Sequence, residues 1–442
     1  MALISVTLAL FTSLPVVVRG EESTTGGNTA YGLMDLYQHA LERAETIQIT
    51  EESVYITGLL KTKARAVLVP RITAFGDHTR YDEKKEFMGS VMLPESTTNY
   101  GVRLDQSFTL NGKEIIAFQA AKDMIEKSEQ DLNTVKETYL FQVAAAYYDL
   151  LRARKAENIA IANEKRLSAH RDAVIMRLKL EEVPKTDLFR AEAELSSARA
   201  ELVKAVNTIA LARAVLARVA FLEPGFQVIE PDREEVRIAE YQLEALKQAA
   251  VKNRSEIKAQ RFSEEIAEKQ IRFTKGDFWP RISVEAMYLN SEQDPASPID
   301  DTDTFSVGLK LEYPLFDGGL RRANVSEERA RKRQVDLQTQ DLIKQIHIEV
   351  EEAYLAVASL KGVLDALDDQ FSFAKENIEA VTLQYRNGLA DILDVLDANT
   401  LLVNSETQLA EALYRLQQAG LLLDRVRGTF LTGILEKVDT TK

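Results

Sequence analysis

The sequence has no cysteine, four histidines and a single tryptophan in 442 residues. Without cysteine the chain cannot form a disulfide, use a thiolate as a metal ligand or nucleophile, or carry a lipid on an N-terminal cysteine. The four histidines are scattered at His39, His78, His170 and His347, and none has the spacing of a helical zinc motif. We therefore expect no metal site and no cofactor.

Basic residues are also in the minority. The chain has 55 lysines and arginines against 69 aspartates and glutamates, a net charge of −14. This balance argues against nucleic acid as a partner. The sequence contains no Walker loop, no G-x-S-x-G motif and no G-x-G-x-x-G motif that opens a helix after a strand. Carboxylate pairs are common on charged helices and do not indicate acid–base chemistry, so we do not expect an enzyme.

Long apolar runs are missing too. After the N-terminus no stretch approaches the roughly 18 apolar residues of a membrane-spanning helix. Residues 1–20, "MALISVTLALFTSLPVVVRG", form a short apolar run typical of a signal peptide, although no basic residue precedes it. A polar segment over 21–32 follows. We expect residues 1–20 to direct export.

The two halves of the chain match each other at a constant separation of 207 positions. Tyr147 in "VAAAYYDLL" corresponds to Tyr354 in "VEEAYLAVA". The same separation relates other pairs, such as Val143 and Val350, Ala146 and Ala353, Asp187 and Asp394, Leu195 and Leu402, and Arg218 and Arg425. Such a sustained register indicates a tandem duplication.

Each repeat is expected to contain a helix, two strands, a very long helix and a second helix. The first repeat, 33–223, has a helix over 33–66, strands at about 68–81 and 99–110, a long helix over 113–182 and a helix over 185–222. After a linker at 224–234, the second repeat, 235–428, has a helix over 235–275, strands at about 280–290 and 304–316, a long helix over 320–387 and a helix over 391–427. A tail over 429–442 ends the chain. A wholly helical 113–182 would extend roughly 100 Å at about 1.5 Å per residue.

The expected strands alternate between apolar and polar residues, which predicts a sheet with one face of each kind. Charged side chains occupy successive positions of the polar face: Arg103, Asp105, Glu285, Lys310 and Glu312. Ionised residues in such positions suit a water-filled barrel lumen better than a dry core. Four strands cannot close a membrane barrel, since the smallest have about eight. We therefore expect a cyclic oligomer.

Two motifs of the second half resemble those of a known protein family. They are "LEYPLFDGG" (311–319) and "YRNGLADILDVLDA" (385–398). The weaker first-half counterparts are "LDQSFTLNGK" and "RLKLEEVPKTDLFRAEAEL". In order and spacing the chain resembles the TolC-like outer membrane efflux proteins from about Tyr31 to Arg427. The resemblance implies a mixed α and β membrane protein that forms a homotrimer. Each chain would give four strands to a twelve-stranded outer membrane β-barrel and its long helices to a periplasmic α-helical barrel.

The function implied by the resemblance is a passive exit duct of a tripartite efflux pump or a type I secretion system. Its expected partners are outer membrane lipid, a periplasmic adaptor (membrane fusion protein) and an inner membrane transporter of the RND or ABC type. The alternative is a soluble periplasmic helical adaptor or scaffold without a pore. The strand pairs favour the duct, and no residue indicates the cargo.

The resemblance also assigns residues to a periplasmic gate. Asp394 and Asp397 match aspartates that ring the pore constriction. Tyr385, Thr186 and Asp187 match the latch that ties the helical turns together. Ala390 stands where an arginine makes gate-closing links in the best-known member, so that salt-bridged latch cannot form here.

Other residues of these motifs have simpler interpretations. Asp391 is expected to cap the helix that follows it. Gly318 and Gly319 are expected in a strand-to-helix turn with positive φ. Trp279 suits either an aromatic anchor at the membrane interface or interior packing.

Overall fold

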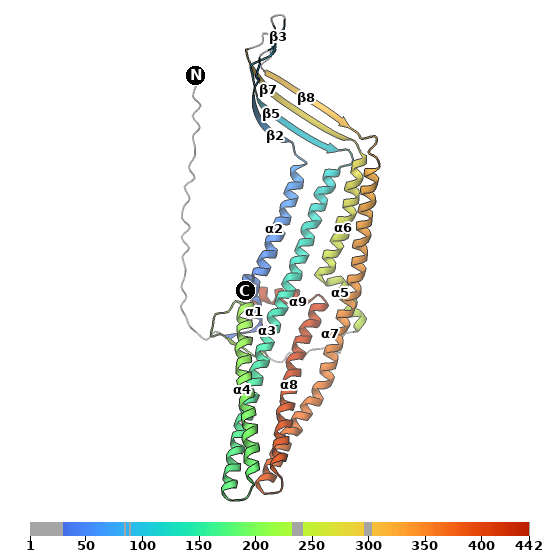
Figure 1. The fold of residues 1–442 in the computed structure, drawn as a ribbon. Helices are drawn as coiled ribbons and strands as arrows, with labels where there is room; N and C mark the ends of the chain where they lie inside the picture. Colours follow the sequence, from blue (N-terminus) through green and yellow to red (C-terminus); the bar gives the residue numbers. More distant parts are fainter. Residues whose placement is uncertain (1–29, 84, 88–89, 232–241, 296–302, 442) are drawn as a thin grey trace.

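The chain forms an elongated layer of long helices with a β-sheet at one end and two helical turns at the other (Figure 1). The structure is a computed structural model that describes residues 30–83, 85–87, 90–231, 242–295 and 303–441. The expected signal peptide, residues 1–20, lies outside the described residues.

Four long helices form two antiparallel hairpins. They are α3 (Lys113–Lys179), α4 (Lys185–Ala220), α7 (Leu320–Arg386) and α8 (Ile392–Val426). These bounds lie within three residues of the expected ones. Residues 113–183 contain neither glycine nor proline, so nothing in the local sequence interrupts α3 before Pro184.

The helix expected before each strand pair is in fact two helices. The first approach divides into α1 (Leu33–Arg43) and α2 (Glu45–Ala66), and the second into α5 (Leu243–Asn253) and α6 (Ser255–Lys275). The chain turns at Ala44 and Arg254, where ψ values of 116° and 135° are extended rather than helical. The expected helix residues 235–241 lie outside the described residues. Neither break has a glycine or proline signal, and Ala44 is fully buried, so tertiary packing decides the turn.

The main sheet is antiparallel and has the order β2–β5–β7–β8. Its strands are β2 (Arg71–Arg80), β5 (Ser96–Thr109), β7 (Arg281–Asp294) and β8 (Asp303–Glu312). The expected strands 68–81 and 304–316 were too long, because Pro70 and Pro314 lack the N–H that a ladder needs. At the end of the sheet away from the helices, β5 begins before the expected residue 99 and β7 continues past the expected residue 290. Within the described residues β2 and β8 each pair with one neighbour, so both are edges.

Six elements of the described residues were not expected at all. The polar turn after β2 contains the hairpin of β3 (Lys85–Phe87) and β4 (Ser90–Leu93). In the segments 21–32 and 224–234, β1 (Ala30–Tyr31) pairs in parallel with β6 (Gln227–Val228). The tail 429–442 contains α9 (Phe430–Thr441). A short 3-10 helix, η1 (Gly276–Phe278), precedes β7.

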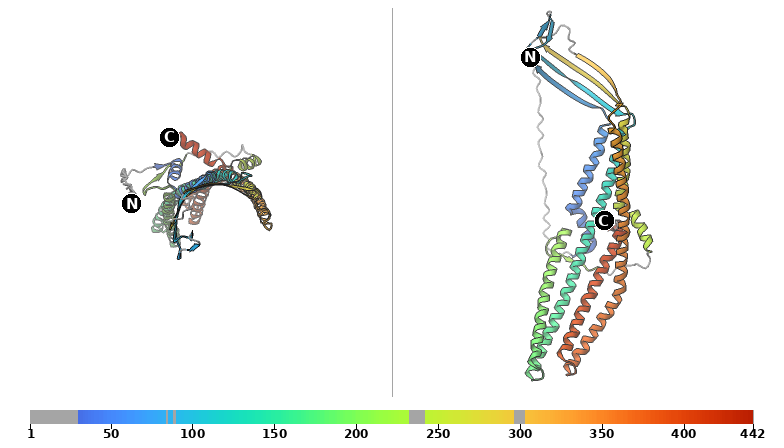
Figure 2. Two further views of the ribbon diagram at one scale, coloured as in Figure 1. Left: turned by 90° about the horizontal axis from the view of Figure 1, so that it is seen from above. Right: turned by 45° about the vertical axis from the view of Figure 1, so that its right-hand side comes forward.

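The largest apolar core lies halfway along the helices. Here α1 and α9 cover α3, and the core includes Leu36, Leu140, Tyr147, Leu216 and Phe430. Seen from above, the helices and the sheet follow one arc, and α9 lies on its convex side (Figure 2). The tail is therefore part of the core, because its apolar residues recur at helical spacing and have an apolar surface to cover.

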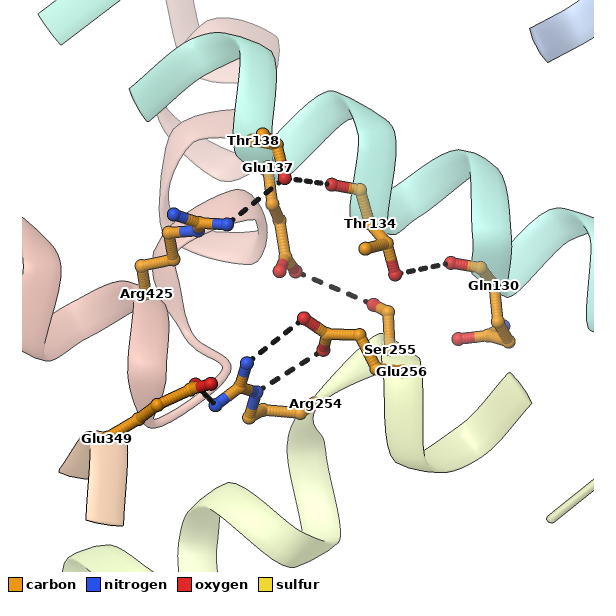
Figure 3. A network of polar contacts seen from close by, with 9 residues as sticks. All are labelled: Gln130, Thr134, Glu137, Thr138, Arg254, Ser255, Glu256, Glu349 and Arg425. Carbon is orange, nitrogen blue, oxygen red and sulfur yellow. Dashed lines mark hydrogen bonds and ion pairs between the residues drawn. The ribbon is translucent and has the colours of Figure 1, made fainter. Parts of the chain in front are cut away.

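A polar network joins α3, α6, α7 and α8 near the same level (Figure 3). Arg254 binds Glu256 through Nη2 at 3.1 Å and Glu349 of α7 through Nη1 at 2.5 Å. Arg425 of α8 donates from Nη2 to Thr138 Oγ1 at 3.1 Å. The corner between α5 and α6 is thereby fixed to the neighbouring helices.

Glu137 of α3 is the buried carboxylate of this network, and 5% of its surface is exposed. Its Oε1 accepts from Ser255 Oγ at 3.5 Å. Burial, and then the nearby Glu256 carboxylate, raise the pKa of Glu137 to about 7, although Arg425 and Arg254 oppose the shift. The charge of Glu137 is thus sensitive to pH near neutrality.

Candidate functional site

The turns of the two helical hairpins lie side by side at the end opposite the sheet (Figures 1 and 2). One turn joins α3 to α4 over 180–184, and the other joins α7 to α8 over 387–391. A small apolar cluster packs the two hairpins together: Val174, Ala191, Tyr385, Ile392 and Val395. This tip contains most of the predicted gate residues.

The aspartates of the second turn differ in their contacts. Asp391 is the N-cap of α8, and its Oδ1 accepts from the Asp394 N–H at 3.0 Å. Asp394 returns the interaction, since its Oδ2 accepts from the Asp391 N–H at 2.9 Å. This is a reciprocal capping box. The capping role expected for Asp391 is confirmed, and Asp394 shares in it.

Asp394 and Asp397 are three positions apart on α8, so they lie on the same side of the helix. Both are exposed in the single chain. Asp394 therefore has two possible uses, as a cap for its own helix and as a charge at the tip surface.

Tyr385 lies in the last turn of α7 and is buried. Within the described residues its hydroxyl has no hydrogen-bond partner, so it binds neither Thr186 nor Asp187. Thr186 is exposed and Asp187 is half-buried. Burial raises the pKa of Tyr385, Arg177 opposes this rise, and Asp187 adds to it. Asp187 is thus close enough to affect Tyr385, without a hydrogen bond from the tyrosine hydroxyl.

Arg177 of α3 is a tip residue that the sequence analysis missed. Its Nη1 donates to the Tyr385 carbonyl at 3.1 Å, and its guanidinium lies over the Tyr385 ring at 4.7 Å from the centroid. The available signal was a basic residue in the last turn of a long helix. That signal does not reveal a partner 208 positions away. Ala390, in contrast, packs against the apolar tip cluster.

The strand pairing places the five predicted lumen residues on one face of the sheet. Asp105 lies opposite Glu285, and Glu285 lies opposite Gly308, which fixes the face of Lys310 and Glu312. On this face Arg103 Nε donates to Asp105 Oδ2 at 3.0 Å, and Lys310 Nζ lies 3.3 Å from Glu312 Oε2.

The opposite face of the sheet is apolar. On β8 it presents Phe305, Val307, Leu309 and Leu311, which are 65–75% exposed in the single chain. An apolar patch of this kind marks a surface that contacts lipid or another protein.

The junction between β8 and α7 depends on two glycines and an aspartate. Gly318 and Gly319 have φ values of 67° and 93°. Asp317 accepts from the backbone N–H groups of Gly319 and Arg321, both at 3.0 Å, and so caps α7. Nearby Trp279 is 54% exposed, so it does not pack inside the single chain.

Two other kinds of site are absent from the described residues. No three histidine, aspartate or glutamate side chains there are grouped so that they could hold a metal ion. None of the helices in the described part of the chain has the length and apolarity needed to cross a bilayer.

Comparison with known proteins shows which proteins this chain is similar to. The family model described as outer membrane efflux protein matches residues 246–429. The chain is 22% identical over 400 residues to outer membrane protein TolC of Escherichia coli, covering 87% of this chain and 80% of TolC. It is 21% identical over 432 residues to the alkaline protease secretion protein AprF of Pseudomonas aeruginosa, covering 93% and 86% respectively.

Solved structures agree with this result. The outer membrane protein VceC from Vibrio cholerae superposes with a TM-score of 0.78 at 19% identity, over 90% of this chain and 96% of VceC. The CmeC outer membrane channel of Campylobacter jejuni gives 0.80 at 15% identity, over 92% and 88%. These likenesses confirm the expected mixed α and β fold.

These relatives and structural neighbours are outer membrane proteins, secretion proteins and channels, and the chain shares the fold of the solved ones. The chain thus resembles the TolC-like outer membrane efflux proteins, and the family model covers its second half.

Proposed function

We propose that three copies of this chain form one outer membrane channel, which serves as a passive exit duct from the periplasm to the exterior. The duct belongs to a tripartite efflux pump or a type I secretion system. Relatives from both settings support this proposal, since they include an outer membrane efflux protein and two protease secretion proteins.

The observation that carries the proposal is the open, curved sheet. It has four strands, its edges β2 and β8 lack a second neighbour among the described residues, and it continues the arc of the helices (Figure 2). An open edge of this kind favours pairing with another chain. Rotation of the same chain about one axis would pair β8 of one copy with β2 of the next and close the ring.

The two faces of the sheet support the same arrangement. The polar face with Arg103, Asp105, Glu285, Lys310 and Glu312 would line a water-filled lumen, and the apolar face would contact lipid. A soluble periplasmic adaptor, the alternative, would leave the apolar side chains of β8 in water.

At the other end, Asp394 and Asp397 of each copy would line the periplasmic entrance. Carboxylates repeated around a narrow opening attract cations, so the entrance would be cation-selective and open to block by polyvalent cations. The tips would meet a periplasmic adaptor, which connects the duct to an inner membrane transporter of the RND or ABC type.

The first experiment is fractionation of cells that express the full chain. We expect the protein in the outer membrane, as a trimer that dissociates on heating. Recovery from the soluble periplasm would contradict the proposal and favour the adaptor.

The second experiment measures conductance and ion selectivity in planar bilayers. The variant Asp394→Asn, Asp397→Asn removes the charges, and asparagine keeps an oxygen that can accept the Asp391 N–H. We expect lower cation selectivity and weaker block by polyvalent cations. The matched control is Glu192→Gln, Glu194→Gln, which neutralises two exposed carboxylates of α4. If both double variants behave like the parent, the two aspartates do not line the entrance.

A further inference from the structure

Arg177 connects the last turns of the two longest helices. It lies in the last turn of α3, and the carbonyl that it binds belongs to Tyr385 in the last turn of α7. The carbonyls at a helix C-terminus lack intrahelical partners and carry partial negative charge, so they attract a cation. Gly388 N–H also donates to the Tyr385 carbonyl, at 3.1 Å. The guanidinium thus stabilises the end of α7 from a different hairpin.

The guanidinium is held by three groups. Besides the Tyr385 carbonyl it contacts the Tyr385 ring, and its Nε donates to Glu182 Oε2 at 3.2 Å. Glu182 belongs to the turn between α3 and α4, so the arginine is oriented by its own hairpin and binds the other. The arginine side chain is 24% exposed, which limits the competition from water.

Tyr385 contacts α3 at a second place. The His170 ring, two turns before Arg177, lies 5.3 Å from the Tyr385 ring. Burial lowers the pKa of His170, which favours its neutral form in this apolar contact. The tyrosine therefore packs between two α3 residues, and its ring and carbonyl make the contacts.

The second turn supplies no cation of its own. Residues 387–391 read Asn-Gly-Leu-Ala-Asp, and Ala390 packs in the apolar tip cluster. The α7–α8 hairpin has Arg386 at the end of α7, but the guanidinium that binds the Tyr385 carbonyl comes from α3.

We infer that Arg177 is the positioning residue that couples the α3–α4 hairpin to the α7–α8 hairpin at the tip and keeps the channel entrance closed through Tyr385. This inference rests on the proposed channel function and specifies its regulation. In this inference, widening of the entrance separates the α7–α8 hairpin from the α3–α4 hairpin, because these two hairpins pack together at the tip. That movement breaks the hydrogen bond to the carbonyl and the contact with the ring together.

Planar-bilayer recording of the full-length trimer tests the inference. Arg177→Met removes the charge and the donor and keeps a long apolar side chain. We expect the open-state probability to rise roughly tenfold, the change that about 1.4 kcal/mol produces. Arg177→Lys keeps a cation near the ring and should restore part of the closure. The control is Lys165→Met, which removes one exposed positive charge from the same helix.

Heat-dependent dissociation of each trimer checks that the variants assemble. If Arg177→Met does not assemble, Arg177→Gln takes its place, because it removes the charge and keeps an amide donor. Parent-like gating of the assembled uncharged variant would overturn the inference, and the parent's own conductance would still support the channel. Absence of conductance in the parent would instead refute the proposed function, so the two failures are distinguishable.

Discussion

The long helices α3 and α7 are two copies of one element in different places. Each has 67 residues, and their ends are 207 positions apart. Yet fourteen residues of α3 are buried, against seven of α7. The difference arises because α3 is in contact with α2, α4, α6 and α8, whereas α7 lies at the edge of the layer against α5, α6 and α8.

The comparison shows that helical periodicity and burial are separate properties. Both helices have apolar residues at the spacing of a packed seam. On α7, however, many of these residues remain more than half exposed in the single chain: Leu337, Ile348, Leu355, Phe373 and Leu383. In the proposed trimer a neighbouring copy would cover this edge.

The ends of α3 and α7 differ as well. Glu181 and Gly388 are equivalent positions, and both have left-handed backbone, with φ of 59° and 73°. Pro184 precedes α4 and Asp391 precedes α8, again at equivalent positions, but the capping box forms at Asp391. Gly388 and Asp391 of the second turn therefore suit the backbone conformation at their positions better than Glu181 and Pro184 do in the first turn.

The largest expected effect tests the central position of α3. Tyr147 is fully buried and donates to the Ile229 carbonyl, whereas its equivalent Tyr354 is partly buried. Tyr147→Ala should lower the free energy of unfolding by about 3–5 kcal/mol, because it leaves a cavity and an unpaired carbonyl. Tyr354→Ala should have a smaller effect. Equal shifts of the thermal midpoint would mean that the two helices are equally buried in the assembled protein.

The second prediction concerns Glu137, whose equivalent on α7 is the exposed Lys344. The pKa of Glu137 is raised from 4.5 to about 7, so the folded state prefers the protonated form. The resulting stability is fully present below pH 4.5 and is lost as the pH rises through 7. One pKa unit corresponds to about 1.4 kcal/mol, so the total is on the order of 3 kcal/mol.

Thermal midpoints between pH 5 and pH 9 measure this effect. Glu137→Gln should remove most of the loss of stability near pH 7, and Lys344→Gln should leave the profile unchanged. An unaltered profile in Glu137→Gln would show that other groups cause the pH dependence.

The third prediction concerns substitutions at Gly388 and Glu181, the two equivalent residues with left-handed backbone. A Cβ in this conformation costs about 1–2 kcal/mol, so Gly388→Ala should destabilise the second turn by that amount. Nothing lies within 4 Å of the added Cβ, so the cost is one of backbone conformation alone. Glu181→Gly should be neutral or stabilising by less than about 1 kcal/mol, since glycine also gains freedom in the unfolded chain. Denaturant midpoints of the two variants decide between these outcomes.

The smallest effect is expected for the helix cap. Asp391→Ala should cost about 1 kcal/mol, because the N–H of Asp394 loses its acceptor. Asp391→Asn should cost less, since asparagine is a good cap. Hydrogen exchange of the first turn of α8 measures the effect, and equal protection in parent and Asp391→Ala would argue against the capping box.

Much of the candidate site could be read from the sequence because its signals are local. Asp391 at a helix start, Gly318 and Gly319 before α7, and the charged alternation of the strands depend on neighbours within a few residues. Arg177 could not be found in this way, because its role depends on Tyr385 of another hairpin. The groups through which Tyr385 contacts α3 could not be predicted for the same reason, since only the packing shows that its ring and its carbonyl meet Arg177.

By itself the sequence determined the helices, the alternating strands, the separation of 207 positions and the resemblance to an efflux family. These follow from periodicity and from motifs that are continuous in the chain. The tertiary structure decided which copy of the long helix is central, that the tail is a core helix, that Glu137 is buried among charged groups and that Arg177 reaches Tyr385. Each of these depends on which elements become neighbours, and that is settled by packing across the arc rather than by any short stretch of residues.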